Sequence, residues 1–235
     1  MRRFLFPLLL VLVLSLGACG DDEPESSGTA GATTETSSGT GGGTTETSSS
    51  GAAGCETVEV PAPKQDGGEE APTDPLDSGT TYELVVGTSC GDFTITLDPA
   101  LAPKTTASLV ALAESGFYDD TTFHRVVPGF VIQGGDPTGT GTGGPGYTTV
   151  DPPPSDTRYT ESVVAMAKSG AEPPGSSGSQ FFVVTAPDAG LSPDYAVVGT
   201  VTEGMETVRA IEALGAGDGP PSQPVVIETI SVEES

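Results

Sequence analysis

The chain has 235 residues, and its 33 aspartates and glutamates outnumber its 8 lysines and arginines, which gives a formal net charge of −25 at pH 7. Nucleic acid and anionic lipid head groups would repel so acidic a chain, and we expect neither as a partner. A single histidine excludes a histidine-rich metal site, and no GxSxG, HExxH or P-loop motif is present. We therefore expect no metal and no cofactor.

The chain begins with MRRFLFPLLLVLVLSLGACG. Two arginines precede an apolar run that is too short and too asymmetrically flanked for a permanent spanning helix, which needs about 20 apolar residues. The small residues before Cys19 resemble a bacterial lipobox. We predict a lipoprotein signal peptide over residues 1–18 and lipidation of Cys19, which would anchor an exported protein to the outer face of the cell membrane. Ordinary secretion is the alternative.

Residues 20–54 contain no aromatic and no branched aliphatic side chain, and residues 61–80 are rich in proline, glycine and acidic residues. Such segments cannot bury a core. The composition predicts a disordered tether rich in Ser, Thr, Gly and Pro over residues 19–81, which leaves one compact domain over residues 82–235.

Once Cys19 is assigned to lipid, two cysteines are left, Cys55 and Cys90. Both would lie outside the cytoplasm, where disulfides persist. We predict that they form a disulfide, which would fix the end of the tether to the first strand. Two free thiols are the alternative, because a flexible segment need not hold them in bonding geometry.

The domain begins with two short runs of β-branched residues around a glycine-containing turn over residues 82–98, which predicts a hairpin. The apolar spacing after Pro103 predicts an amphipathic helix that ends at Gly116. A second helix is predicted over 204–214, and strands over 130–133, 163–167, 180–185, 195–202 and 225–232. Many short strands with two helices predict a mainly β fold, a closed or nearly closed barrel with helices over its ends.

Residues 123–137 read FHRVVPGFVIQGGDP and place Arg125 inside an apolar run. A half-buried guanidinium needs an acceptor, because an unpaired one would cost several kcal/mol. That acceptor could be a substrate or, alternatively, a carboxylate in a structural ion pair. His124, next to it, is interpreted as a structural residue.

Arg125 accompanies Gln133 and Gln180, and apolar side chains surround these three positions in the sequence. Such a set suits an uncharged, partly apolar ligand with a carbonyl to hold. The glycine-rich segment GTGTGGPG at 139–146 lacks the lysine and the strand-loop-helix context of a phosphate site, so it is interpreted as a mobile loop.

Three segments carry a family resemblance: FHRVVPGFVIQGGDPTGTGTGG, SGSQFFVVTAP and VVGTVTEGMETVRAIEALG. In this order and spacing they resemble the cyclophilins, the peptidyl-prolyl cis/trans isomerases. The resemblance implies an eight-stranded antiparallel closed β-barrel capped by two α-helices, with a peptide-binding groove. It also implies catalytic roles for Arg125, Phe130 and Gln133, and substrate-binding roles for Val131, Ala167, Lys168, Gln180, Phe182, Leu191 and Tyr195.

The chain departs from that pattern at three positions. Gly190 stands where many cyclophilins have tryptophan, Tyr195 where many have histidine, and Val131 where methionine is common. Loss of the indole should weaken binding of cyclosporin. The expected function is isomerisation of X-Pro bonds in exported, folding polypeptides by a monomeric enzyme. The alternative is a proline-peptide binding module or chaperone with little turnover.

Overall fold

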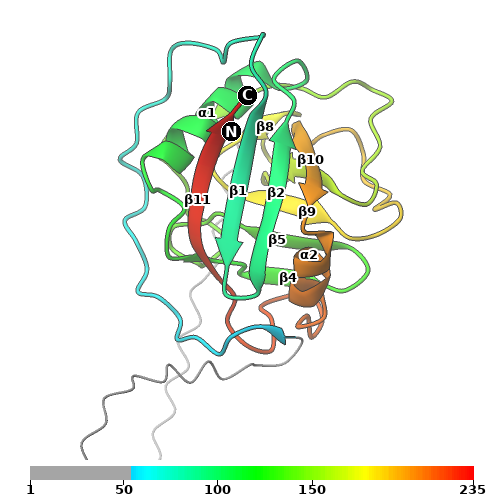
Figure 1. The fold of residues 1–235 in the computed structure, drawn as a ribbon. Helices are drawn as coiled ribbons and strands as arrows, with labels where there is room; N and C mark the ends of the chain where they lie inside the picture. The colour runs from blue at the N-terminus through cyan, green and yellow to red at the C-terminus, as the bar shows by residue number, and fades with distance from the viewer. Residues whose placement is uncertain (1–53) are drawn as a thin grey trace, which may run out of the picture. The chain divides into compact units, whose positions relative to one another are not determined.

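The computed structural model describes residues 54–235, and predictions that concern residues 1–53, including the signal peptide and Cys19, lie outside the described part. Its main sheet has nine antiparallel strands in the order β3-β11-β1-β2-β10-β7-β9-β5-β4, and β6 pairs with β8 in a second small sheet (Figure 1). The strands are β1 (Tyr82–Thr88), β2 (Gly91–Leu97), β3 (Thr121–Thr122), β4 (Arg125–Val127), β5 (Val131–Gly134), β6 (Thr149–Val150), β7 (Val163–Met166), β8 (Ser176–Ser177), β9 (Phe181–Val184), β10 (Val197–Glu203) and β11 (Val226–Glu234).

The main sheet curls into a half-barrel, so that β9, β5 and β4 run across the direction of β1 and β2 (Figure 1). The prediction of a closed eight-stranded barrel is wrong, because β3 and β4 are the two edges of the sheet and do not pair with each other. These short strands follow one another along the chain, with only Phe123 and His124 between them. Arg125 pairs with Gln133 and an isolated bridge joins Thr122 to Asp136, so β3 and β4 follow one line past β5 and its end and do not fold back on each other.

The two predicted helices are confirmed as α1 (Pro103–Glu114) and α2 (Met205–Glu212). Helix α1 has proline in its first turn, where the missing N–H costs nothing, and buries Leu109 and Leu112. Helix α2 follows Gly204, which adopts φ 76°, and buries Val208 and Ile211. A side chain at Gly204 would also clash with the backbone of β2, so glycine is required at this start.

Strand β9 separates two apolar clusters, because successive side chains of a strand point to opposite faces. Phe181 packs in the main core, with its ring centroid 6.0 Å from Tyr118 and 6.2 Å from Phe123. Phe182 belongs to a smaller cluster with Tyr159 and Tyr195. The second cluster lies beneath the candidate site described below.

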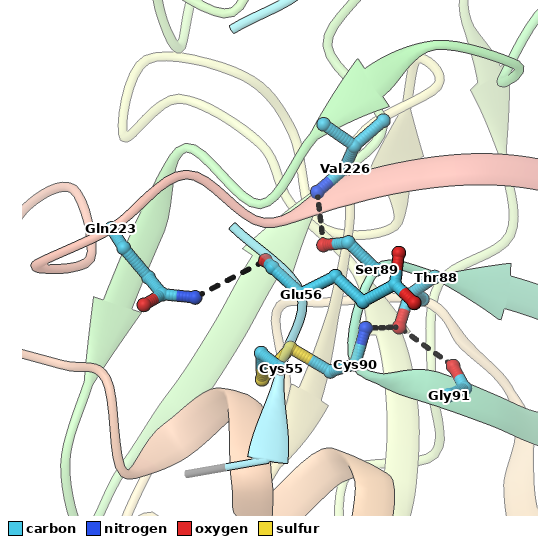
Figure 2. The surroundings of a disulfide bond; sticks show 8 residues. All are labelled: Cys55, Glu56, Thr88, Ser89, Cys90, Gly91, Gln223 and Val226. Carbon is cyan, nitrogen blue, oxygen red and sulfur yellow. Dashed lines mark hydrogen bonds between the residues drawn. A yellow bond between two sulfur atoms is a disulfide. The ribbon is translucent and has the colours of Figure 1, made fainter. Parts of the chain in front are cut away.

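Residues 54–81, here called the strap, lie along the domain (Figure 1). The sequence predicts that they belong to a disordered tether that reaches residue 81. The strap starts at the β1–β2 turn, where a disulfide joins Cys55 to Cys90. Figure 2 shows that Gln223 donates to the Glu56 carbonyl beside this bond. The strap then runs up one side of the domain and enters β1 at Tyr82 (Figure 1).

A lysine fixes the middle of the strap to the domain. The Lys64 ammonium donates to three backbone carbonyls just after helix α1, those of Gly116, Phe117 and Asp119, at 2.9, 2.8 and 3.0 Å. The carbonyls near a helix C-terminus attract cations, because they carry the negative end of the helix dipole. The predicted tether is therefore replaced, over residues 54–81, by an ordered segment whose partners are distant in sequence.

Lys64→Met is expected to lower the free energy of unfolding by about 1–3 kcal/mol, because charge-assisted hydrogen bonds to three carbonyls are lost while the aliphatic packing is kept. Denaturant unfolding of the variant and the parent chain measures this difference. Lys104→Met is the matched control, because the exposed side chain of Lys104 makes no hydrogen bond or ion pair within residues 54–235. Equal midpoints for Lys64→Met and the parent would contradict the assigned role.

Candidate active site

Side chains from β4, β5 and β9 and from the loops after β7 and β9 surround a hollow of about 300 Å³, here called the apolar hollow. Nine of the ten residues to which the resemblance gives catalytic or substrate-binding roles line it. They are Arg125, Phe130, Val131, Gln133, Ala167, Lys168, Phe182, Leu191 and Tyr195. The tenth, Gln180, lines an adjoining hollow and is hydrogen bonded to Gln133.

The floor of the apolar hollow is rigid and aromatic. Phe182 is 4% exposed, and its ring meets Tyr195 edge to face at a centroid distance of 5.6 Å. Tyr159, which is fully buried, donates its hydroxyl proton to the Tyr195 carbonyl at 2.7 Å and accepts the Tyr195 N–H at 3.0 Å. The hollow thus offers a preformed apolar surface with little freedom to collapse.

Arg125 stands at the rim of this hollow because it opens β4 opposite Gln133 of β5. Its Nε donates to the Asp218 carboxylate at 2.6 Å and its Nη1 donates to Gln133 Oε1 at 3.3 Å. Within residues 54–235, Nη2 has no acceptor. Two partners therefore orient the guanidinium, and one of its nitrogens keeps a free donor. Arg125 makes a carboxylate ion pair, which was one interpretation of the sequence, and Nη2 can still donate to a ligand, which was the other.

Asp218 is exposed, and its hydrogen bond to Arg125 and the positive charge of that residue lower the pKa of Asp218 below its ordinary value. The guanidinium also lies 5.8 Å from the centroid of the Phe130 ring. A cation over an aromatic face is held electrostatically. Sequence reasoning missed Asp218, whose only local signal was a Gly- and Pro-rich loop.

A chain of side-chain amides leads away from the arginine. Gln133 Nε2 donates to Gln180 Oε1 at 3.1 Å, and Gln180 Nε2 donates to the Gly143 carbonyl at 2.9 Å. Each amide accepts on its oxygen and donates on its nitrogen, so the orientation of one fixes that of the next. The glycine-rich loop is thereby connected to Arg125 through two glutamines.

The loop at 139–146 is anchored, although the sequence predicted a mobile loop. The Asp136 carboxylate, which is fully buried as a residue, accepts the backbone N–H groups of Thr138, Gly141 and Gly143 at 2.7, 2.5 and 3.2 Å. Burial alone would raise the pKa of Asp136, but these hydrogen bonds and the Thr138 hydroxyl lower it overall. A charged carboxylate thus holds the loop against β5.

The site offers hydrogen-bond donors and an apolar hollow to a ligand. Within residues 54–235 there is no group of three or more His, Cys, Asp or Glu side chains that could hold a metal ion.

In the same part of the chain, no helix has the length and apolar character needed to cross a membrane.

Comparison with known proteins identifies the family. The family described as "Cyclophilin type peptidyl-prolyl cis-trans isomerase/CLD" matches residues 83–232. The chain belongs to the cyclophilin-type peptidyl-prolyl cis-trans isomerase family. Its cyclophilin domain therefore starts in β1 and ends in β11, and the strap lies before it.

Several curated cyclophilins are similar to the chain. Peptidyl-prolyl cis-trans isomerase A of Mycobacterium tuberculosis is 39% identical over 172 residues, which cover 65% of this chain and 92% of the relative. Peptidyl-prolyl cis-trans isomerase B of Streptomyces anulatus is 41% identical over 166 residues, which cover 62% of this chain and 93% of the relative. Both relatives are thus matched over nearly their whole length.

Among solved structures, a cyclophilin-type isomerase of Cryptosporidium parvum superposes with a TM-score of 0.60 at 32% identity, covering 65% of this chain and 98% of that one. The same protein solved in the presence of the dipeptide Ala-Pro gives a TM-score of 0.59 at 31% identity, with coverage of 64% and 98%. The curled antiparallel sheet and two helices of this chain match that cyclophilin fold.

The departure at Gly190 has a backbone component. Gly190 adopts φ 63°, a left-handed conformation that costs a tryptophan about 1 kcal/mol or more, although a Cβ atom at this position would meet nothing within 4 Å. Gly190 also donates its N–H to Asp188, which forms an ion pair with Arg158. The missing indole is therefore accompanied by a loop conformation that favours glycine.

The environment of His124 is expected to make the stability of this domain depend on pH. Burial lowers the pKa of His124 below its ordinary value, against the opposing effect of the Asp136 charge. The unfolded chain, with an ordinary pKa of about 6.5, therefore binds the proton first as the pH falls. The free energy of unfolding is expected to decrease as the pH falls through about 6.5, and to be fully recovered above it.

Because His124 is the only histidine, this contribution can be isolated. His124→Gln should flatten the decrease in unfolding free energy between about pH 7 and pH 5, measured by denaturant unfolding at a series of pH values. A variant with the same slope as the parent chain would show that another group titrates there.

Proposed function

We propose that this chain accelerates cis-trans rotation about X-Pro bonds, with Arg125 as the donor that stabilises the twisted amide. The observation that carries this is a guanidinium fixed at the rim of an apolar hollow, with Nε and Nη1 held by Asp218 and Gln133 and Nη2 free for a ligand. The hollow is of a size to receive a proline ring. The family and the Ala-Pro dipeptide present with the Cryptosporidium relative support the same substrate class.

The chemistry requires no nucleophile and no metal. Rotation about an X-Pro bond crosses a barrier of about 18–20 kcal/mol, because amide resonance is lost in the twisted state. The prolyl nitrogen then regains a lone pair, which a guanidinium N–H can hydrogen bond. Only a contact that is stronger in the twisted state than in the planar ones accelerates the reaction, and each 1.4 kcal/mol of such preference is worth about tenfold in rate.

The residues of the site divide this work. The proline ring is held by apolar contact with Phe130, Val131, Phe182 and Leu191. Such contact contributes a binding free energy of about 0.8 kcal/mol for each methylene buried. Arg125 acts on the twisted amide. Gln133 holds Arg125 through one amide oxygen and remains near the path of the polypeptide, together with Gln180, Ala167, Lys168 and Tyr195.

Magnetisation-exchange NMR of a short X-Pro peptide with catalytic amounts of the mature chain tests this proposal. The exchange rate between cis and trans forms should rise in proportion to protein concentration. A folded chain that binds the peptide without raising this rate would favour the alternative, a proline-peptide binding module or chaperone with little turnover.

The location is proposed from the sequence before the described part. The signal sequence at residues 1–18 and Cys19 support export and lipid anchoring at the outer face of the cell membrane, where the clients would be exported polypeptides that are still folding. The Cys55–Cys90 disulfide is consistent with an oxidising compartment. We also propose that the chain is a monomer. Intact-mass analysis of chain extracted from membranes, before and after Cys19→Ser, tests the anchor, and gel filtration tests the monomer.

A further inference from the structure

A second hollow, of about 650 Å³, adjoins the apolar hollow and shares Gln133, Ala167 and Lys168 with it. We call it the polar hollow, because the glycine-rich loop, Glu172 and Gln180 line much of it. A polypeptide whose proline occupies the apolar hollow would advance by roughly 3.3–3.6 Å per residue when extended. Residues within about three positions of the proline therefore reach the polar hollow.

One wall of the polar hollow comes from the strap. Asp66 lines it, and Asp66 Oδ1 accepts the N–H of Gly144 at 2.9 Å. The strap and the loop are further joined because the Gly67 N–H donates to the Gly144 carbonyl at 2.9 Å and the Glu69 N–H donates to the Pro145 carbonyl at 3.0 Å. Asp66 is thus held in place by backbone pairing on its C-terminal side.

The carboxylate of Asp66 has unused capacity. Within residues 54–235 its Oδ2 has no hydrogen-bond or ion-pair partner, while Oδ1 takes the loop amide. One other carboxylate lines the polar hollow: Glu172 Oε2 accepts the Ser169 N–H at 2.6 Å, and within residues 54–235 its Oε1 has no partner either. The Lys168 ammonium donates to the Ser169 and Glu172 carbonyls and lies 5.5 Å from the Tyr195 ring centroid.

We infer that Asp66 is a specificity-determining residue for this isomerase, favouring polypeptides with lysine or arginine within about three residues of the proline. The inference rests on the proposed function and names the substrates of that same site. Asp66 lies before residues 83–232, the part matched by the family, so the strap adds this contact to the cyclophilin groove. Because Asp66 is exposed, an ion pair there is expected to change kcat/KM by about two- to fivefold.

Peptides with one X-Pro bond test the inference. Lysine, glutamine or glutamate is placed, one at a time, at each of the three positions on either side of the proline, and kcat/KM is measured by the exchange assay at low salt with the mature chain. At one position or more, the lysine peptide should exceed the glutamine peptide by about two- to fivefold and the glutamate peptide should fall below it. High salt should reduce the difference.

Asp66→Asn is the decisive variant, because asparagine retains the oxygen that accepts the Gly144 N–H and removes only the charge. Its lysine-to-glutamine ratio should fall to about one. Glu228→Gln is the matched control, since it changes the net charge equally on exposed Glu228 of β11, outside both hollows, and should keep the parent ratio. Loss of the preference in both variants would assign it to the overall field of the acidic domain.

The inference is overturned if the parent chain does not distinguish lysine from glutamine peptides, or if Asp66→Asn keeps the distinction. Binding of the same peptides is measured by NMR titration in parallel. If the parent chain isomerises no peptide, the proposed function fails, and the titration still decides the role of Asp66, because the same lysine preference should appear in Kd and disappear in Asp66→Asn.

Discussion

Arg125→Ala is expected to lower kcat/KM for an X-Pro peptide by about 100-fold, the effect of removing one preorganised donor from a developing charge or lone pair. The loss should fall mainly on kcat, because the guanidinium acts on the twisted amide more than on the planar forms. The exchange assay gives the turnover, and NMR titration gives the peptide affinity. The folded structure should be retained, since Arg125 is partly exposed at the rim.

Two further variants separate the roles. Arg125→Lys should restore little activity, because lysine replaces the planar fork held by Asp218 and Gln133 with a mobile point charge. Phe182→Ala removes apolar surface that contacts proline in every state, so it should weaken affinity as well as rate. Near-parental turnover in Arg125→Ala, or a loss of affinity as large as the loss of rate, would disprove the transition-state role.

Loss of the Cys55–Cys90 disulfide is expected to lower the free energy of unfolding by about 2–4 kcal/mol, as chain entropy predicts for a closed loop of this size. The bond joins residues 35 apart and closes a loop that contains the strap and β1. Denaturant unfolding of a Cys55→Ser, Cys90→Ser double variant measures the loss. The double variant should also hold its strap less firmly, because the end of the strap at the β1–β2 turn is released.

The control for the disulfide is the parent chain treated with a reductant under native conditions. It should match the double variant in unfolding midpoint, whereas the oxidised parent should be more stable than either. If oxidised parent and double variant unfold at the same denaturant concentration, the bond contributes nothing measurable, and the strap is held without it, by hydrogen bonds such as those of Lys64, Asp66 and Gly67.

The elements that could be predicted from the sequence are those with local signals. The hairpin at residues 82–98 and both helices appear where turn residues and apolar spacing predicted them. The opposite facings of Phe181 and Phe182 follow from the period of a strand. The lining of the apolar hollow came from motif resemblance, because residues from four separate segments meet there only after folding.

The features that the sequence did not predict depend on partners far along the chain. Asp218 is separated by 93 residues from Arg125, which it orients. The strap has the composition of a disordered segment, yet Lys64 and the disulfide order it through contacts more than 30 residues away. The glycine-rich loop has one apolar side chain, Pro145, and besides Asp136 nearby it is held by the distant strap, through hydrogen bonds of its backbone with Asp66, Gly67 and Glu69.

The position of the disulfide at the start of the strap also determines how the domain responds to mechanical tension. A pull on the chain before residue 54 reaches Cys55 and passes through the covalent sulfur bridge directly to Cys90, in the turn between β1 and β2. Residues 56–81 lie within the loop that this bond closes, so they bear no load while it is intact. The hydrogen bonds between the strap and the glycine-rich loop, and with them the Asp66 wall, are thereby isolated from any force that acts between the chain before residue 54 and a polypeptide bound in the two hollows.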